Sequence, residues 1–360
     1  MTKNRSEQKS LRELDQDLVN HWYIACLSEE LTNDSALART VYENPYVLYR
    51  DSSNRAVAML DRCIHRGAQL SQGKCSGGHL HCPYHGWVYG EKGSLTEVPS
   101  DGPGANVQPW HGDTVPVREQ DGVIWIWPGE IAKAELAELP WRFPQHGKKG
   151  WGQYFMITDF SSEVTHLVQN FMDVPHTVFV HAKWFRNRRL IKVPMTVDVF
   201  SGHVKVTYEQ PKDVVGFMEM ALNPHKKPVI HTDEYIFPNL TRVDYIFGDR
   251  HFIINSQCTP VARYQTRVYT WICYRMGLIT PLLKPIMRFY TRKVITQDVD
   301  IMVNHGANLR RFGDFFENHQ YKNTQADELH LAVDKIRNAG REGRAPATEQ
   351  KYSRQREFWI

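Results

Sequence analysis

The sequence contains no hydrophobic run of the roughly 20 residues that a helix needs to span a bilayer. Its most apolar stretch, residues 276–290, is interrupted by Pro281, Lys284 and Pro285. The first 20 residues are polar and lack the apolar segment of a signal peptide. These absences predict a soluble, cytoplasmic protein with no membrane partner.

The sequence also has little excess of charge of either sign. Its 44 Lys and Arg residues nearly balance its 40 Asp and Glu residues, and the formal net charge is +4. A net positive charge this small does not indicate a protein that binds nucleic acid. No G-x-G-x-x-G pattern follows a predicted strand, so we expect no NAD(P)H or flavin site in this chain.

Cysteine is scarce, with six residues in a chain of 360. In a reducing compartment they are not expected to form disulfides. Three of the six cysteines and four histidines fall between residues 63 and 87, in a short segment rich in glycine. Thiols clustered beside histidines are more typical of metal ligands than of a disulfide framework.

Residues 45–128 follow a β pattern. The runs 45–50 and 56–61 flank the turn-like segment 51–55 and predict a hairpin, and the run 122–129 predicts a strand closed by Pro128 and Gly129. Residues 130–158 read as a connection rich in Pro, Gly and Trp. We therefore expect an N-terminal tail over 1–20 and a small β domain over 21–130 with the cysteine-rich segment in its loops.

The second part of the chain combines helices with consecutive strands. A helix is predicted over 161–175, capped by Ser161 or Ser162, and further helices over 284–311 and 326–338. Strands are expected over 195–200, 203–209, 239–247, 251–258 and 266–276. This order predicts an α+β domain over 131–338, with an antiparallel sheet covered on one face by helices, and a C-terminal tail in loop conformation over 339–360.

Two pairs of metal-ligand residues stand in the cysteine-rich segment. Cys63 and His65 form a C-x-H pair, Cys82 and His85 form a C-x2-H pair, and sixteen residues separate the pairs. Two thiolates and two imidazoles suit either zinc or a [2Fe-2S] cluster in which two histidines bind one iron. A zinc finger pairs Cys with Cys and His with His, whereas here each loop offers one of each, which favours the cluster.

The segments CIHRG and CPYHGW resemble the signature of Rieske [2Fe-2S] domains, with Gly67 and Gly86 where the loops must turn. Respiratory-chain Rieske proteins carry an additional Cys in each loop, whereas this chain has Arg66 and Tyr84 near those places. The sequence therefore resembles the oxygenase and ferredoxin branch of that family. Three residues of the segment fall outside the pattern and are expected to be loop residues: Cys75, His79 and His81.

A second candidate site lies in NFMDVPHTVFVH, residues 170–181. Asp173 and His176 are three residues apart and would share a helix face, but His181 lies five residues after His176 and would not. Both histidines can face one metal only if the helix distorts, and Pro175 supplies a cause. By itself the pair is weak evidence for a metal site.

Beside a Rieske signature, this segment resembles the N-x2-D-x2-H-x4-H motif of Rieske non-haem iron oxygenases. The resemblance implies that His176 and His181 bind a mononuclear Fe(II) with an aspartate from a C-terminal helix, and that Asn170 lies behind the ligands. Asp298 is the candidate, because it shares an apolar helix face whereas Asp300 should point elsewhere. His305 also shares that face and is the reserve candidate.

The resemblance extends from about Trp22 through the helix that carries Asp298. It implies a Rieske domain followed by a helix-grip catalytic domain in a homotrimer, with O2 as co-substrate and a separate reductase or ferredoxin as electron donor. The implied reaction is monooxygenation or oxidative demethylation of a small organic molecule, with aromatic and cyclic compounds as candidates. Asp173 would bridge the cluster of one subunit to the iron of the next.

Three other classes remain open from the sequence. They are a ring-dihydroxylating dioxygenase, a Rieske electron carrier without oxygenase activity, and a zinc-stabilised binding module. The basic stretch from Lys183 to Lys192 has five basic residues and no acidic one. It is interpreted as a solvated loop, as a docking face for an acidic ferredoxin or as an anchor for a substrate carboxylate.

Overall fold

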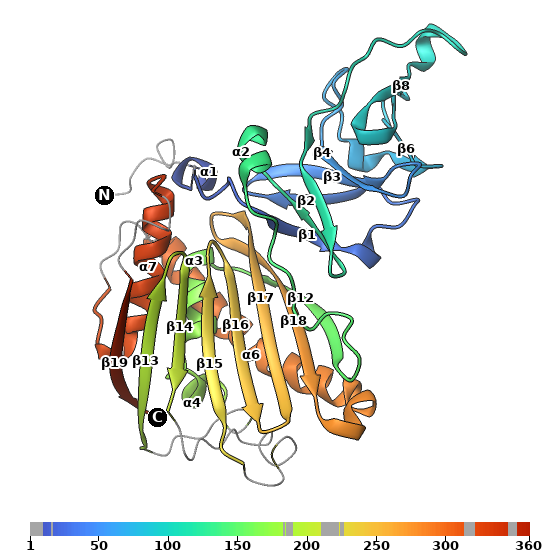
Figure 1. The fold of residues 1–360 in the computed structure, drawn as a ribbon. Helices are drawn as coiled ribbons and strands as arrows, with labels where there is room; N and C mark the ends of the chain where they lie inside the picture. The colour runs from blue at the N-terminus through green and yellow to red at the C-terminus, as the bar shows by residue number, and fades with distance from the viewer. Residues whose placement is uncertain are drawn as a thin grey trace. The chain divides into compact units, whose positions relative to one another are not determined.

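The computed structural model describes residues 10–15, 17–182, 184, 190–209, 223, 227–312, 321–344 and 351–360. The chain forms two compact units, Met1–Pro144 and Gln145–Ile360 (Figure 1). No helix within the described ranges is long and apolar enough to cross a membrane. Of the basic stretch, Lys183, Arg186, Arg188 and Arg189 lie outside the described residues, and Lys192 forms an ion pair with Glu357.

The first unit is built from three small sheets with the strand orders β1-β11-β10, β2-β3-β4-β9 and β5-β6-β7-β8. The predicted hairpin is confirmed, since β3 and β4 pair from Tyr46 with Leu60 to Arg50 with Ala56. The elements are α1 (Leu11–Leu14), β1 (Tyr23–Leu27), β2 (Leu37–Val41), β3 (Asn44–Arg50), β4 (Ala56–Leu60), β5 (Lys74–Ser76), β6 (His79–His81), β7 (Val88–Tyr89), β8 (Leu95–Glu97), β9 (Thr114–Val115), β10 (Val117–Gln120), β11 (Val123–Ile126) and α2 (Ile131–Leu136).

The second unit is an eight-stranded antiparallel sheet with helices. The strands follow the order β12-β18-β17-β16-β15-β14-β13-β19 across the sheet. The elements are β12 (Gly152–Phe160), α3 (Val164–Met172), α4 (Thr177–Val180), β13 (Lys192–Phe200), β14 (His203–Tyr208), β15 (Ile230–Ile236), β16 (Leu240–Phe247), β17 (Arg250–Ala262), β18 (Gln265–Arg275), α6 (Lys284–Phe312), α7 (Glu328–Arg341) and β19 (Tyr352–Trp359).

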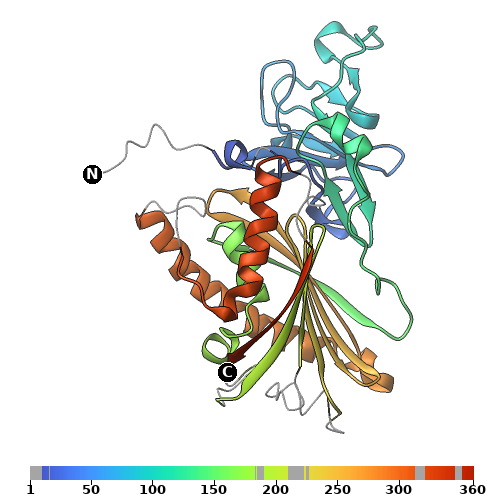
Figure 2. The same ribbon diagram turned by 60° about the vertical axis from the view of Figure 1, so that its left-hand side comes forward.

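The helices of the second unit gather on one side of the curved sheet (Figure 2). Helix α3 contacts β15, β16 and β17, α7 contacts β13 and β14, and α6 contacts β12. Apolar residues of α3 and α7, among them Leu167 and Val333, pack with sheet residues such as Val197 and Val206 in one buried core. The expected α+β class, with helices covering one face of an antiparallel sheet, is confirmed.

Three local expectations were wrong. The expected connection over 130–158 contains helix α2 and most of β12, and the expected tail after residue 338 continues α7 and then forms β19, paired with β13. The cap of α3 is Glu163, whose carboxylate accepts hydrogen bonds from the backbone of Thr165 at 2.8 Å and His166 at 3.2 Å. The carboxylate of Glu163 therefore caps the helix, in place of the hydroxyl expected from Ser161 or Ser162.

Candidate functional site

The first ligand loop of the first unit follows β4 and is closed by its own backbone. Cys63 N–H donates to the carbonyl of Ala68 at 2.8 Å, and Gly67 N–H donates back to the carbonyl of Cys63 at 2.9 Å. Gly67 has a φ of +76°, a conformation that side chains with a Cβ rarely adopt. His65, two positions after Cys63, therefore lies within a tight turn.

The second ligand loop joins β6 to β7 and repeats the same closure. Cys82 N–H donates to the carbonyl of Trp87 at 2.8 Å, and Gly86 N–H donates to the carbonyl of Cys82 at 3.1 Å. Gly86 also lies in the left-handed region, at a φ of +72°. The two loops are thus structural equivalents, although His85 stands three positions after its cysteine rather than two.

The thiols of the two loops point into the core of the first unit. Cys63 and Cys82 are both buried among apolar residues, and burial raises the pKa of the Cys82 thiol. The Tyr89 hydroxyl accepts a hydrogen bond from Ile64 N–H at 3.2 Å and lies 3.2 Å from Cys63 Sγ, so its own proton is available to the sulfur.

The two histidines lie side by side on the outer part of the loops. The rings of His65 and His85 are 4.6 Å apart, and His65 stacks on Trp87 at 4.5 Å with an interplanar angle of 4°. Trp87 stacks in turn on Trp110, which is exposed. Nδ1 of His65 is buried without a hydrogen-bond partner among the described residues, as fits a nitrogen that binds a metal.

The four residues fit a two-iron cluster better than a single zinc ion. A zinc tetrahedron brings all four ligand atoms close to one another. The four loop residues do not form such a close group. Among the described residues, a close group of at least three ligand atoms, all within 4.8 Å of one another, is formed only by His176, His181 and Asp298. A further expectation was wrong: Cys75, His79 and His81, expected to be loop residues, lie on the short strands β5 and β6, which pair with each other beside the ligand loops.

The second candidate site lies where a helix of the second unit breaks. Helix α3 ends at Met172, and α4 begins at Thr177, so Asp173 to His176 form the connection. The break, with Pro175 inside it, turns the two histidines toward each other, and Nε2 of His176 lies 3.2 Å from Nε2 of His181. The distortion expected from Pro175 is present.

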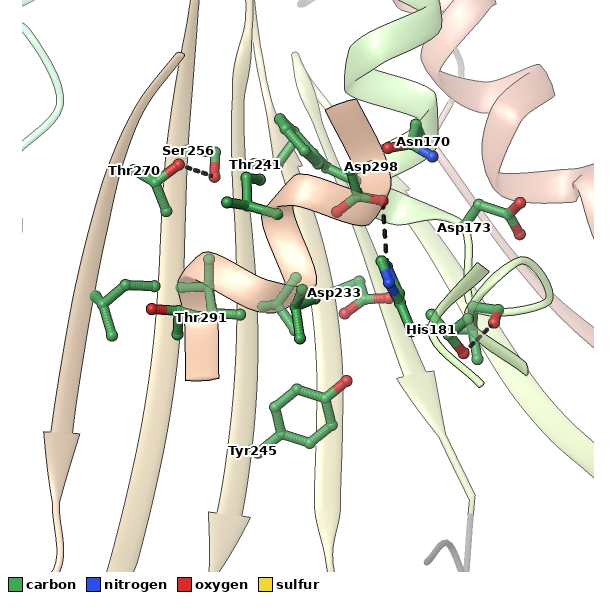
Figure 3. A pocket seen from close by; sticks show the side chains of 18 of the residues that line it. Asn170, Asp173, His181, Asp233, Thr241, Tyr245, Ser256, Thr270, Thr291 and Asp298 are labelled. Atoms are coloured by element: carbon green, nitrogen blue, oxygen red, sulfur yellow. Dashed lines mark hydrogen bonds and ion pairs between the residues drawn. The ribbon is translucent and has the colours of Figure 1, made fainter. Parts of the chain in front are cut away.

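Asp298 reaches the same point from α6. Its Oδ1 lies 3.1 Å from Nε2 of His181 and 3.5 Å from Nε2 of His176 (Figure 3). Asp298 is 5% exposed, whereas Asp300 is exposed. Two imidazoles and one carboxylate converging on one face match the donor set of a mononuclear non-haem Fe(II) site with open positions.

The histidines and carboxylates of this group shift one another's pKa values. Burial would lower the pKa of His176, but the carboxylates of Asp173, 3.7 Å from Nδ1, and of Asp298, 3.5 Å from Nε2, raise it to about 9. Burial would raise the pKa of Asp298, but its contacts with His176 and His181 hold it below its usual range. The carboxylates of Asp173 and Asp298 therefore stabilise a positive charge among these side chains, whether a proton on His176 or a bound cation in its place.

Each ligand histidine also has a contact on its other nitrogen. Nδ1 of His181 lies 3.1 Å from Oε1 of Gln297, and Nδ1 of His176 lies 3.7 Å from Oδ2 of Asp173. Such contacts fix the tautomer and orientation of a metal-binding imidazole. Sequence reasoning missed Gln297, whose only signal is its place directly before Asp298.

The reserve candidate His305 is not brought to this group. Its ring packs at 4.8 Å against His166, and both line a polar recess together with Tyr321. Asn170 does lie at the site, since it lines the same cavity as the three ligands, and its Oδ1 is buried without a hydrogen-bond partner among the described residues.

The three ligands open onto a cavity of about 120 Å³ between the sheet, α3, α4 and α6. Its wall is mainly apolar, and two polar residues of β15, His231 and Asp233, also face it. Sequence reasoning missed both, because it predicted no strand where β15 lies. The apolar and aromatic lining residues are Met156, Phe171, Val174, Val243, Tyr245, Phe252, Ile254, Ile272, Tyr290, Val294 and Ile295.

The two units match two protein families. Residues 21–116 match the Rieske [2Fe-2S] domain, and residues 160–349, over half of the chain, match the vanillate O-demethylase oxygenase C-terminal domain. The chain belongs to the Rieske oxygenases that combine these two domains. Members of this family carry a [2Fe-2S] cluster and a mononuclear non-haem iron, and they use O2.

Two bacterial relatives have similar sequences. The oxygenase component of dicamba O-demethylase from Stenotrophomonas maltophilia is 34% identical over 53% of this chain and 56% of its own length. The vanillate O-demethylase oxygenase subunit from Pseudomonas sp. is 33% identical over 55% of this chain and 54% of its own length. The matched part of this chain thus spans about half the length of either relative.

Solved structures share the fold. The crystal structure of dicamba monooxygenase bound to dicamba aligns with a TM-score of 0.79 at 23% identity, covering 90% of this chain and 98% of that one. Pseudomonas putida NdmA with caffeine aligns with a TM-score of 0.74 at 20% identity, covering 92% of this chain and 93% of that one.

Proposed function

We propose that this protein is the terminal oxygenase of a multicomponent Rieske system and hydroxylates a small organic substrate. Where the hydroxylated carbon is an O-methyl group, that group is then lost from the substrate. The balanced reaction consumes the substrate, one O2, two electrons and two protons, and yields the hydroxylated product and water. The O-demethylase activities named for the two bacterial relatives support demethylation. The electrons come from a separate reductase or ferredoxin.

The observation that carries this proposal is the convergence of His176, His181 and Asp298 on the wall of a mainly apolar cavity. We assign these three residues as the ligands of the mononuclear iron, which binds and activates O2 when present. We assign Cys63, His65, Cys82 and His85 to the cluster, which passes on single electrons. The apolar wall excludes water, and Gln297 and Asp173 orient the imidazoles.

Asp173 is proposed as the link between a cluster and an iron site in different subunits of a homotrimer. It contacts His176 and also lines the polar recess on the other side of the cavity wall, and its side chain is 26% exposed. A carboxylate in this position can accept a hydrogen bond from a histidine of each site at once. This role requires that the recess be covered by a second copy of the chain.

The proposal is tested by iron analysis followed by turnover. The purified protein should hold about three irons per chain, two in the cluster and one at the ligand triad. Supplied with a reductase, methoxyarenes and ¹⁸O₂, it should release formaldehyde carrying one labelled oxygen or a singly labelled alcohol. Two labelled oxygens in a ring diol would indicate dihydroxylation. Two irons per chain and no O2 uptake would indicate an electron carrier.

A further inference from the structure

The cavity beside the candidate iron site has an ordered floor. Facing side chains of β15 to β18 form three cross-strand rows, one of hydroxyls, one mainly aliphatic and one aromatic. Figure 3 shows Thr241, Asp233 and Tyr245 at successive levels of this floor. The rows are Thr241, Ser256 and Thr270, then Asp233, Val243, Ile254 and Ile272, then His231, Tyr245 and Phe252.

Asp233 and His231 form a polar network at the β15 edge of this floor. Nε2 of His231 lies 3.0 Å from Oδ1 of Asp233, and the hydroxyl of Tyr208 donates to Oδ2 at 2.9 Å. The imidazole is held between two aromatic rings, with Tyr208 at 4.5 Å and Tyr245 at 4.3 Å. All four residues are at least nine-tenths buried.

The fold does not need this network for packing. Burying a carboxyl group costs free energy even when it is hydrogen-bonded, and apolar residues of similar volume often stabilise a core equally well. The network lies on a different element from His176, His181 and Asp298, and it faces the same cavity. A buried polar network in an apolar pocket is the usual means of orienting a ligand.

We propose that Asp233, held by His231 and Tyr208, is the acceptor for a hydrogen-bond donor group on the substrate, and that this site selects uncharged one-ring compounds over carboxylates. The proposal rests on the proposed function, since it concerns the same cavity. Each carboxylate oxygen of Asp233 has one hydrogen-bonding contact and retains a second lone pair for a substrate O–H or N–H.

Size and charge define this substrate class. A cavity of about 120 Å³ is close to the engineered cavity of about 150 Å³ in another protein that binds benzene. The charged residues among the described lining side chains are Asp173, Asp233 and Asp298, with neither Lys nor Arg among them. His176, the lining imidazole whose pKa is raised, already lies against Asp173 and Asp298, so a substrate carboxylate would lose its hydration there without gaining a Lys or Arg partner from the described lining residues.

Three methoxyarenes that differ in one substituent test the proposal. They are 2-methoxyphenol, which has a hydroxyl donor, methoxybenzene, which has none, and 2-methoxybenzoate, which has a carboxylate. Binding to the Fe(II)-loaded protein is measured without O2 or electron donor, by calorimetry and by the spectrum of the nitric oxide adduct. We expect 2-methoxyphenol to bind roughly 10-fold more tightly than methoxybenzene, and 2-methoxybenzoate to bind most weakly.

Variants locate the effect. Asp233→Asn keeps the shape but removes the charge, so it should reduce the preference for 2-methoxyphenol over methoxybenzene and improve binding of 2-methoxybenzoate. Tyr208→Phe removes a donor that offsets part of the carboxylate's negative charge, so it should shift both ratios in the opposite direction, and it tests the proposal even if Asp233→Asn does not fold. The matched control is Glu234→Gln, on the same strand but on the opposite face of the sheet.

Three results would overturn the proposal. They are tightest binding of 2-methoxybenzoate by the unaltered protein, absence of 2-methoxyphenol binding up to its solubility limit, and ratios in folded Asp233→Asn or Tyr208→Phe that equal those of Glu234→Gln. Because these measurements need neither turnover nor a reductase, they stay separate from the test of oxygenase activity. A protein that binds as expected but consumes no O2 would contradict only the proposed function.

Discussion

Gln297 accepts a hydrogen bond from His181: its Oε1 lies 3.1 Å from Nδ1 of the ring, on the side opposite Asp298. This contact places the proton on Nδ1 and leaves the lone pair of Nε2 directed at the candidate iron position. Gln297 and Asp298 are adjacent on α6, so one turn of helix supplies both a candidate ligand and the group that orients another candidate ligand.

Replacing Gln297 with Leu should weaken Fe(II) binding by roughly 10- to 100-fold, because the imidazole loses the contact that fixes its tautomer. Chelator competition measures the affinity, and the nitric oxide adduct reports any change in ligand geometry. Gln297→Glu keeps an acceptor and should restore most of the affinity. Asp300→Asn, an exposed change on the same helix, is the control. Equal affinities in Gln297→Leu and the control would contradict the positioning role.

Asp298→Ala should remove the mononuclear iron and abolish turnover while the colour of the cluster persists, because the cluster ligands lie in the other compact unit. His305→Ala should keep that iron, since His305 packs against His166 in the polar recess. Iron analysis combined with the visible spectrum distinguishes the two variants. Loss of the mononuclear iron in His305→Ala and its retention in Asp298→Ala would reverse the assignment.

Tyr89→Phe should lower the midpoint potential of the cluster by roughly 50 mV, since a hydrogen bond to a sulfur ligand stabilises the reduced, more negative state. The hydroxyl lies 3.2 Å from Cys63 Sγ. Tyr49→Phe is a matched control, because that hydroxyl donates to the carbonyl of Gly90 at 2.6 Å instead. Spectroscopic redox titration gives both values, and an unchanged potential in Tyr89→Phe would show that the contact does not tune the cluster.

The features that the sequence predicted well depend on local signals. The Cys63 and Cys82 loops carry their glycines at fixed offsets, and the break between α3 and α4 follows from Pro175. The features that it missed depend on neighbours distant in the chain. Asp233 became part of a cavity wall only through pairing of β15 with β14 and β16, and β19 resembled a loop because its edge position is rich in charged residues.

Glu234 should make stability depend on pH at the acid end. Its carboxylate contacts His203 at 3.3 Å and Lys205 at 3.0 Å, and these contacts lower its pKa from 4.5 to about 2. A lowered folded-state pKa stabilises the fold above the ordinary value, and the contribution is lost as the pH falls from 4.5 toward 2. Glu234→Gln should therefore lower the free energy of unfolding by about 1–2 kcal/mol at pH 7.

Urea unfolding of the unaltered protein and of Glu234→Gln between pH 7 and pH 3.5 tests this expectation. The difference in free energy of unfolding should stay constant from pH 7 to about pH 5 and shrink below pH 4.5. A difference that does not change with pH would mean that the carboxylate contributes packing or neutral hydrogen bonds rather than charge.

Asp173→Asn should preserve the fold and both metals but slow the passage of electrons from the reduced cluster to the iron site. The carboxylate lies 3.7 Å from Nδ1 of His176 and faces the recess where a second copy is proposed to dock. An amide cannot accept hydrogen bonds from two histidines as well as a carboxylate can, so the link between the sites is weakened without loss of volume.

Single-turnover kinetics of the pre-reduced protein with O2 and substrate measure this step, and sedimentation velocity separates it from loss of the trimer. If Asp173 bridges the sites, Asp173→Asn should reoxidise its cluster more slowly and form less product while remaining a trimer with its full iron content. Asn308→Asp, an exposed change on α6 at another wall of the recess, should not slow that step. If Asp173→Asn matches the unaltered protein in reoxidation rate and product yield, Asp173 only orients His176, and the proposed bridging role is wrong.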